Sequence, residues 1–323
     1  MTALLDPAVL FFVFGIVAGL LRSNLEIPAP IARFLSLYLL MALGLKGGFA
    51  LAKSGLTVDV AMTLGAALLL AVLVPAMGYL LLRRFLNGFD AAAVAATYGS
   101  VSAVTFITAV QMLDAQGVPY GGHMAAAMAL MESPAIVMAV LLANKARRAS
   151  GAQGPQTGVG SLLRESLTDG AQLLLIGAMV VGVLSGEAGR EAMQPFSGDL
   201  FKGMLAFFLL DMGLQAARHM GSLKGQHPGA MAYALLAPLV HASLALGVAW
   251  LMGLPVGDGI LLMALAASAS YIAVPAVVRH AIPEANPALY FGMSLGMTFP
   301  FNVLLGLPLY MTAAKAVLGS GPG

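Results

Sequence analysis

The sequence predicts an all-α integral membrane protein in which ten transmembrane helices form two inverted five-helix repeats. Three observations support this fold class: the composition, the spacing of apolar runs and an internal repeat. Of the 323 residues, 60% are hydrophobic and 9% are charged, and the mean hydropathy is +0.92. Soluble proteins carry about 25% charged residues, so this composition excludes a water-soluble surface of ordinary size.

Apolar runs divide the chain into ten predicted spans. A membrane-spanning helix needs about 20 predominantly apolar residues, and the runs are close to this length. The polar stretch 147–168, rich in Gly, Ser, Gln and Pro, is typical of a flexible linker. It separates a first repeat at 1–146 from a second at 169–323. The predicted spans are 7–21, 28–51, 58–82, 90–113, 121–146, 169–185, 199–217, 229–252, 258–279 and 286–314.

Five spans in each half place the second half upside down in the membrane relative to the first. The sequences of the two halves also align. Asp90 and Asp258 are 168 residues apart (258 − 90), and at this offset 99–102 aligns with 267–270. The sequence therefore predicts an inverted repeat whose most polar feature lies inside the fourth and ninth spans.

Basic residues predict the orientation of the chain. Loops after odd-numbered spans, with the adjoining helix ends, hold eleven Lys and Arg, and the other side holds five. Because basic residues concentrate in cytoplasmic loops, we expect the linker in the cytoplasm and both termini outside it. The eleven are Arg22, Arg33, Arg83, Arg84, Lys145, Arg147, Arg148, Arg164, Arg218, Lys224 and Arg279, and the five are Lys46, Lys53, Arg190, Lys202 and Lys315.

A serine pair interrupts each of the two aligned spans: Ser100 with Ser102, and Ser268 with Ser270. Residues two apart do not share a helical face, so both hydroxyls reach one ligand only if the helix opens. Broken helices at matching positions of two repeats are typical of a transporter's substrate site near the membrane centre. The exposed amide ends of half-helices favour an anion there. The alternative is that Ser and Gly serve close helix packing.

Four ionisable residues inside the spans are functional hypotheses, because charges are unfavourable in the membrane. Glu132 lies before Pro134, which loosens the helix one turn earlier; it either binds a coupling cation or proton, or bonds to a neighbouring helix. Lys46, in the glycine-rich stretch 44–48 that predicts another break, either pairs with Asp211 or extends to the membrane surface. His241 is either a packed histidine or a proton relay.

Five motifs carry a family resemblance: LGLKGG at 43–48, YGSVS at 98–102, MESPA at 131–135, MGL at 212–214 and AIPEANP at 281–287. In this order and spacing, they resemble the SbtA-type sodium-dependent bicarbonate transporters over nearly the whole chain. The resemblance implies a core and a gate domain, each drawn from both repeats, and a homotrimer in the bacterial inner membrane. It also implies bicarbonate and sodium sites where the broken fourth and ninth helices cross, and a cytoplasmic regulator of the PII-like type.

Several positions depart from the family pattern. In the fourth span, Ala103 and Val104 stand where the family has a glycine and a serine. Tyr271 stands where the family has the acidic residue of its ion site, and Ala273 stands in place of a serine. These differences suit a less polar anion, or a proton-linked or uncoupled cycle.

We therefore predict a secondary transporter of a small anion, bicarbonate by resemblance, with sodium as the expected coupling ion and no other metal or cofactor. The alternatives are a proton-linked or uncoupled carrier of another organic anion and a non-transporting sensor. Enzyme activity is not expected, because His241 is the single histidine deep inside a span, and the net charge of +2 gives no sign of nucleic-acid binding. The predicted substrate-binding residues are Gly99, Ser100, Val101, Ser102, Thr105, Ala269, Ser270 and Tyr271, and the predicted ion-coupling residues are Ser102, Glu132, Ser268, Ser270 and Asn302.

Overall fold

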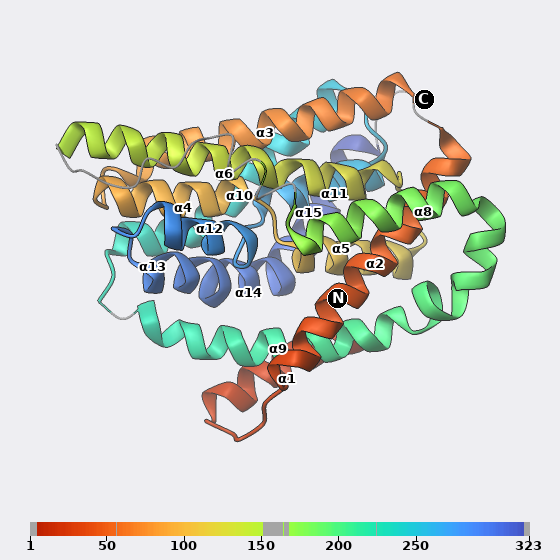
Figure 1. The fold of residues 1–323 in the computed structure, drawn as a ribbon, viewed down its shortest axis with the longest axis horizontal. Helices are drawn as coiled ribbons and strands as arrows, with labels where there is room; N and C mark the ends of the chain where they lie inside the picture. Colours follow the sequence, from red (N-terminus) through yellow and green to blue (C-terminus); the bar gives the residue numbers. More distant parts are fainter. Residues whose placement is uncertain (1–4, 56, 151–163, 165–167, 224, 320–323) are drawn as a thin grey trace.

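A computed structural model describes residues 5–55, 57–150, 164, 168–223 and 225–319 (Figure 1). These residues are 84% helical and contain no strand, which confirms the all-α fold. Helix α6 continues to Ser150, so 147–150 of the predicted linker are helical. Most of the remaining linker, and Lys224, lie outside the described residues.

The chain is a succession of helices joined by short turns. In chain order, the described helices are α1 (Pro7–Leu20), α2 (Ala29–Ser54), α3 (Val58–Leu82), α4 (Gly88–Gly99), α5 (Ala103–Gln116), α6 (His123–Ser150), α8 (Gly170–Met193), the π-helix η2 (Gln194–Asp199), α9 (Phe201–Met220), the 3₁₀ turn η3 (Gly221–Leu223), α10 (Pro228–Leu251), α11 (Val256–Ala267), α12 (Ala273–Ala281), α13 (Pro287–Phe291), the π-helix η4 (Gly292–Thr298), α14 (Phe299–Phe301), the π-helix η5 (Asn302–Gly306) and α15 (Leu307–Leu318).

Within the described residues, seven helical segments are long and apolar enough to cross a membrane, and α1 and α11 are shorter apolar helices. One of the seven, Gly170–Leu223, contains two predicted spans, because α8 runs through η2 into α9 and the backbone departs from helical geometry at Gly186 (φ 56°, ψ −141°). The protein is therefore a multi-pass membrane protein, and the count of ten spans stays a prediction.

The helices pack in two groups. Helices α1, α2, α8 and α9, here called the peripheral group, pack mainly on one another along the lower and right-hand edges of Figure 1. Helices α3–α6 and α10–α15 form the central group. Glycines bring the peripheral helices close together: a Cβ on Gly48 would lie 2.9 Å from Gly182 Cα, and one on Gly213 would lie 3.0 Å from Gly15 Cα. Such small-residue crossings are typical of membrane helices.

One predicted irregularity is absent. Helix α2 is continuous through the glycine-rich stretch 44–48, where the sequence predicts a break. The glycines there serve the crossing with α8 instead, since a Cβ on Gly44 would lie 2.8 Å from Ala178 Cβ. Helix α6 likewise continues through Pro134. At 44–48, packing against α8 outweighs the local preference of the sequence.

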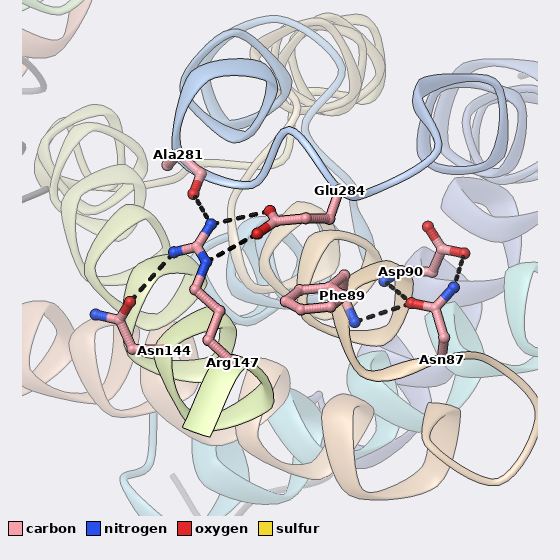
Figure 2. A network of polar contacts seen from close by, with 7 residues as sticks. All are labelled: Asn87, Phe89, Asp90, Asn144, Arg147, Ala281 and Glu284. Atoms are coloured by element: carbon pink, nitrogen blue, oxygen red, sulfur yellow. Dashed lines mark hydrogen bonds and ion pairs between the residues drawn. The ribbon is translucent and has the colours of Figure 1, made fainter. Parts of the chain in front are cut away.

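An arginine network fixes the loop between α12 and α13 (Figure 2). Arg147, at the end of α6, donates through Nε and Nη2 to the two carboxylate oxygens of Glu284, each at 2.9 Å. Its Nη2 also donates to Ala281 O at 2.8 Å, and its Nη1 donates to Asn144 Oδ1 at 3.2 Å. These charged hydrogen bonds hold the pKa of the Glu284 carboxyl below its usual value.

Two aspartates at equivalent positions of the sequence repeat hold equivalent loops. Asp90, in the first turn of α4, accepts a hydrogen bond from the backbone N–H of Asn286 at 2.7 Å. Asp258, in the first turn of α11, accepts one from the backbone N–H of Gly121 at 2.5 Å, and its other oxygen lies 3.6 Å from His123 Nε2. Each aspartate therefore ties its broken helix to a loop in the other half of the chain: Asp90 to the loop before α13, and Asp258 to the loop before α6.

Candidate functional site

The first helix break lies at 100–102. Helix α4 ends at Gly99, Ser100 is extended (φ −94°, ψ −176°), and α5 begins after Ser102. The Ser102 hydroxyl accepts a hydrogen bond from the backbone N–H of Thr105 at 3.2 Å, so it caps α5. Serine competes with helical backbone bonding and stabilises a helix start, which explains why the helix stops and restarts here.

The second break lies at 268–272, and its first three residues align with the first break. Helix α11 ends at Ala267 and Ser268 is extended (φ −81°, ψ 166°). The Ser270 hydroxyl accepts a hydrogen bond from the backbone N–H of Val274 at 3.3 Å, in the first turn of α12. Ser102 and Ser270, which align in the sequence, therefore each bond to the start of a half-helix.

The two breaks contact each other directly. The backbone N–H of Ser102 donates to Ser268 Oγ at 2.9 Å, and the backbone N–H of Ser270 donates to Thr97 O at 2.8 Å. Each break thus supplies a partner for a backbone group that the other break frees, as a buried chain requires. The segment Gly88–Gln116 contains the first break. In its most apolar stretch, 94% of the residues are buried, against 28–61% in the other long apolar segments.

A cavity of about 290 Å³ lies beside this crossing. Four of the predicted substrate-binding residues line it: Val101, Ser102, Ser270 and Tyr271. Glu132 also lines it, together with apolar side chains of α2, α5, α6, α9 and α12. The cavity extends to Asp169 at the start of α8, so residues from both helix groups enclose it.

The other predicted site residues lie behind the cavity wall. The Thr105 hydroxyl donates to Ser102 Oγ at 3.0 Å, and the Ser268 hydroxyl donates to Leu265 O at 2.9 Å. A Cβ on Gly99 would lie 2.5 Å from Pro75 Cγ, so Gly99 serves close packing against α3. The predicted residues that do not line the cavity are Gly99, Ser100, Thr105, Ser268, Ala269 and Asn302.

Several polar groups at the crossing have no hydrogen-bond partner among the described residues. The buried hydroxyls of Ser100 and Tyr271 have no hydrogen-bond partner among the described residues. Ala103 and Val104, in the first turn of α5, line the cavity, and a helix provides no acceptor for amides at these positions. Free amides at a helix start carry partial positive charge, so this end of the cavity suits an anion.

Glu132 has a partner that the sequence does not predict. Gln172, on α8 of the peripheral group, donates from Nε2 to the Glu132 carboxylate and, at 3.2 Å, to Ala129 O. Gln172 is buried, and it also lines the cavity. The signal that could have identified it is a single amide side chain at the start of an otherwise apolar run.

Asn302, the aligned counterpart of Glu132, has a different place. Its Nδ2 donates to Ala267 O at 2.9 Å, at the end of α11, and its Oδ1 accepts a hydrogen bond from the Tyr310 hydroxyl at 2.8 Å. Asn302 therefore positions the second break from outside the cavity. The structure does not bring it together with Glu132 as a pair of cavity-lining residues.

The remaining ionisable candidates do not meet at the crossing. Lys46 pairs with Asp114 at 3.2 Å, and the Asp211 carboxylate accepts a hydrogen bond from Gln215 at 2.6 Å, so the alternative in which Lys46 pairs with Asp211 is not realised. His241 is buried in α10 with its ring 6.3 Å from that of Tyr233. Among the residues that the structure describes, no three His, Cys, Asp or Glu side chains gather as a metal site.

Comparison with known proteins agrees with the geometry. A search of curated proteins gave no match. A sequence profile of the Na⁺-dependent bicarbonate transporter superfamily matches residues 7–315, which is nearly the whole chain. The match includes both helix breaks and every residue that lines the cavity. The chain therefore belongs to the Na⁺-dependent bicarbonate transporter superfamily.

Proposed function

We propose that the protein is a secondary transporter of a small anion in the bacterial inner membrane, with bicarbonate as the first candidate substrate. The observation that carries this proposal is the cavity where two serine-capped half-helices meet. Its polar end is formed by the first-turn amides of α5 and by the Ser102, Ser270 and Tyr271 side chains. Family membership supports a transporter rather than an enzyme.

The charges of the cavity favour coupled transport. Glu132 and Asp169 line it, and no Lys, Arg or His is among its described lining residues. An anion would be repelled by these carboxylates unless a cation entered with it or a carboxylate took up a proton. Glu132 is the closer candidate for this role, because a neutral amide, Gln172, holds it at the cavity wall. Sodium and a proton are the two cations to distinguish.

The architecture that we propose is two inverted five-helix repeats, with the central group as the moving core and the peripheral group as the gate. The matching roles of Asp90 with Asp258 and of Ser102 with Ser270 support the repeat. The arginine-rich loops support an orientation with both termini outside the cytoplasm. The homotrimer and the PII-like cytoplasmic regulator rest on the family resemblance.

The proposal is tested with purified protein in proteoliposomes. The double variant Ser102→Ala with Ser270→Ala removes both capping hydroxyls from the cavity, and we expect at least a tenfold loss of labelled bicarbonate uptake. A matched double variant is Ser185→Ala with Ser243→Ala, whose hydroxyls are exposed and bond within their own helices. This control should transport like the parent protein. Size-exclusion and circular dichroism verify that both variants fold.

The outcomes separate the alternatives. Unchanged uptake of bicarbonate and small carboxylates by the Ser102 and Ser270 variant contradicts the proposed site. If the parent protein binds the anion but does not transport it, the protein is a sensor and not a transporter. Uptake that follows an imposed sodium gradient identifies sodium as the coupling ion, and uptake that follows only a pH gradient identifies the proton. In either case Glu132→Gln should remove the dependence on the gradient.

A further inference from the structure

A second cavity, of about 390 Å³, lies between the two helix groups. Helix α2 of the peripheral group forms one wall, and α5, α6 and the loop 117–122 of the central group form the others. The loop is the one that Asp258 holds, and it lies at the opposite end of α6 from Arg147. None of the predicted site residues lines this second cavity.

The second cavity continues the first along the same three helices. On α2, Leu40 lines the first cavity and Leu43, one turn later, lines the second. On α6, which runs in the opposite direction, Met128 lines the first cavity and Met124 lines the second. We call the contact of α2 with α5 and α6 the seam. The two cavities lie along this seam, and an apolar layer separates them.

Lys46 is the one basic side chain among the described residues that line either cavity. Its Nζ lies 3.2 Å from Asp114 Oδ2 and 4.3 Å from the centre of the Phe201 ring. Asp114 is also held by Tyr120, whose hydroxyl donates to Asp114 Oδ1 at 2.9 Å. Burial and the nearby carboxylate raise the pKa of the Tyr120 hydroxyl, so it remains a donor at neutral pH.

The pair of Lys46 and Asp114 is open to exchange. The two side chains are 27% and 36% exposed, and ion pairs at this exposure contribute roughly 0–1 kcal/mol. An arriving oxyanion can therefore compete with Asp114 for the ammonium without a large loss of stability. The Phe201 ring, which belongs to the peripheral group, keeps the ammonium at the seam when Asp114 is displaced.

We propose that this second cavity is a separate anion-binding site, in which Lys46 binds an oxyanion and Asp114 is the internal counter-ion that the oxyanion displaces. The choice of bicarbonate as the oxyanion rests on the proposed function. The argument that the cavity binds an anion rests on its electrostatics alone. Lys46 belongs to the peripheral group, whereas Asp114 and Tyr120 belong to the central group. Binding of an anion at Lys46 therefore also releases an ionic contact between the two groups.

The absence of cysteine from the chain allows a direct test. Ala50→Cys places a single thiol in the wall of the second cavity, one turn beyond Lys46. Its reaction rates with a sulfonate-bearing and a trimethylammonium-bearing methanethiosulfonate are compared. Removing one unit charge about 8 Å away in a water-like medium changes the ratio of the two rates about fivefold. We expect Lys46→Gln to lower the anionic-to-cationic ratio by this factor and Asp114→Asn to raise it.

The controls address structural damage. Lys46→Arg keeps the charge and should keep the ratio. A thiol at exposed Ala188, in α8, should react with an unchanged ratio in every background. A ratio at Ala50→Cys that responds to neither Lys46→Gln nor Asp114→Asn overturns the inference.

Ligand protection completes the test. Millimolar bicarbonate should slow modification of Ala50→Cys, more strongly with Asp114→Asn and not at all with Lys46→Gln. Absence of protection in all three backgrounds overturns the inference. These readouts need no transport, so a failure of the proposed transport function appears separately, as unchanged uptake by the Ser102 and Ser270 variant.

Discussion

Tyr271 has a hydroxyl that the fold leaves without a hydrogen-bond partner. The residue is 7% exposed, its ring packs against Phe299 at 5.5 Å, and it lines the cavity beside Ser102. A buried hydroxyl without a partner destabilises a protein by about 1–3 kcal/mol. Because Tyr271 also lines the cavity, we assign to its hydroxyl the role of a hydrogen-bond partner for the bound ligand.

Tyr271→Phe separates this role from simple packing. We expect the variant without ligand to be more stable by about 1 kcal/mol, because it no longer buries an unpaired hydroxyl. We also expect it to lose most of the increase in melting temperature that saturating bicarbonate gives the parent protein. Thermal unfolding in detergent with and without bicarbonate measures both effects. A variant that is less stable but keeps the full bicarbonate effect contradicts the assignment.

Glu284 makes the stability of the arginine network depend on pH. Its pKa is lowered in the folded protein by Arg147, so its contribution is present above the unfolded pKa and is lost as pH falls through the folded value. Glu284 is 27% exposed, which reduces the contribution to about 1 kcal/mol. Glu284→Gln should therefore lower the melting temperature by about 1–3 °C at pH 7.

Melting temperatures measured over a series of pH values supply the decisive comparison for Glu284. The difference between Glu284→Gln and the parent protein should shrink as the pH falls below the usual range for a glutamate. Glu187→Gln is the control, because Glu187 pairs with Arg190 on an exposed surface. It should leave the melting temperature unchanged at every pH. A Glu284 effect that is constant with pH would mean that packing, and not charge, holds the loop.

At the scale of elements, glycine has opposite effects in two helices. Gly48 in α2 lies against α8, where a Cβ would come within 2.9 Å of Gly182 Cα, whereas a Cβ on Gly65 in α3 would have no neighbour within 4 Å. Gly48→Ala should destabilise the protein by about 1–3 kcal/mol through overpacking. Gly65→Ala should stabilise it by up to about 1 kcal/mol through helix propensity. Denaturation of both variants checks the signs, and equal effects would rule out the close crossing.

The half-helices show how far local sequence determines an element. Both breaks were predictable from the sequence. Gly99 is followed by the pair Ser100 and Ser102, Ala267 is followed by the pair Ser268 and Ser270, and serine favours the start of a helix. The continuity of α2 through 44–48 was not predictable, since it depends on the distant α8 backbone. Gln172 was missed for the same reason: its partner Glu132 lies 40 residues away in the chain. Contacts between helices, and not local preferences, decide these cases.

At the scale of the whole molecule, the composition was sufficient to predict a multi-pass helical membrane protein, and the repeat was sufficient to predict where the two breaks lie. The division into two helix groups, and the seam with a cavity on each side of its apolar layer, were not predictable. They depend on which helices cross, and apolar runs of similar composition do not specify this. The pairing of Lys46 with Asp114, in place of Asp211, follows from the same crossing.

The bonds from the Ser102 amide to Ser268 and from the Ser270 amide to Thr97 have an evolutionary consequence. Each interruption satisfies its backbone with atoms of the other half, and unpaired backbone is not tolerated in lipid. If the two five-helix repeats that we propose arose from one ancestor, that ancestor, with one such interruption, would have been stable only as an antiparallel pair with a second copy. On this view, duplication and fusion of the gene followed a dimer that inserted in both orientations.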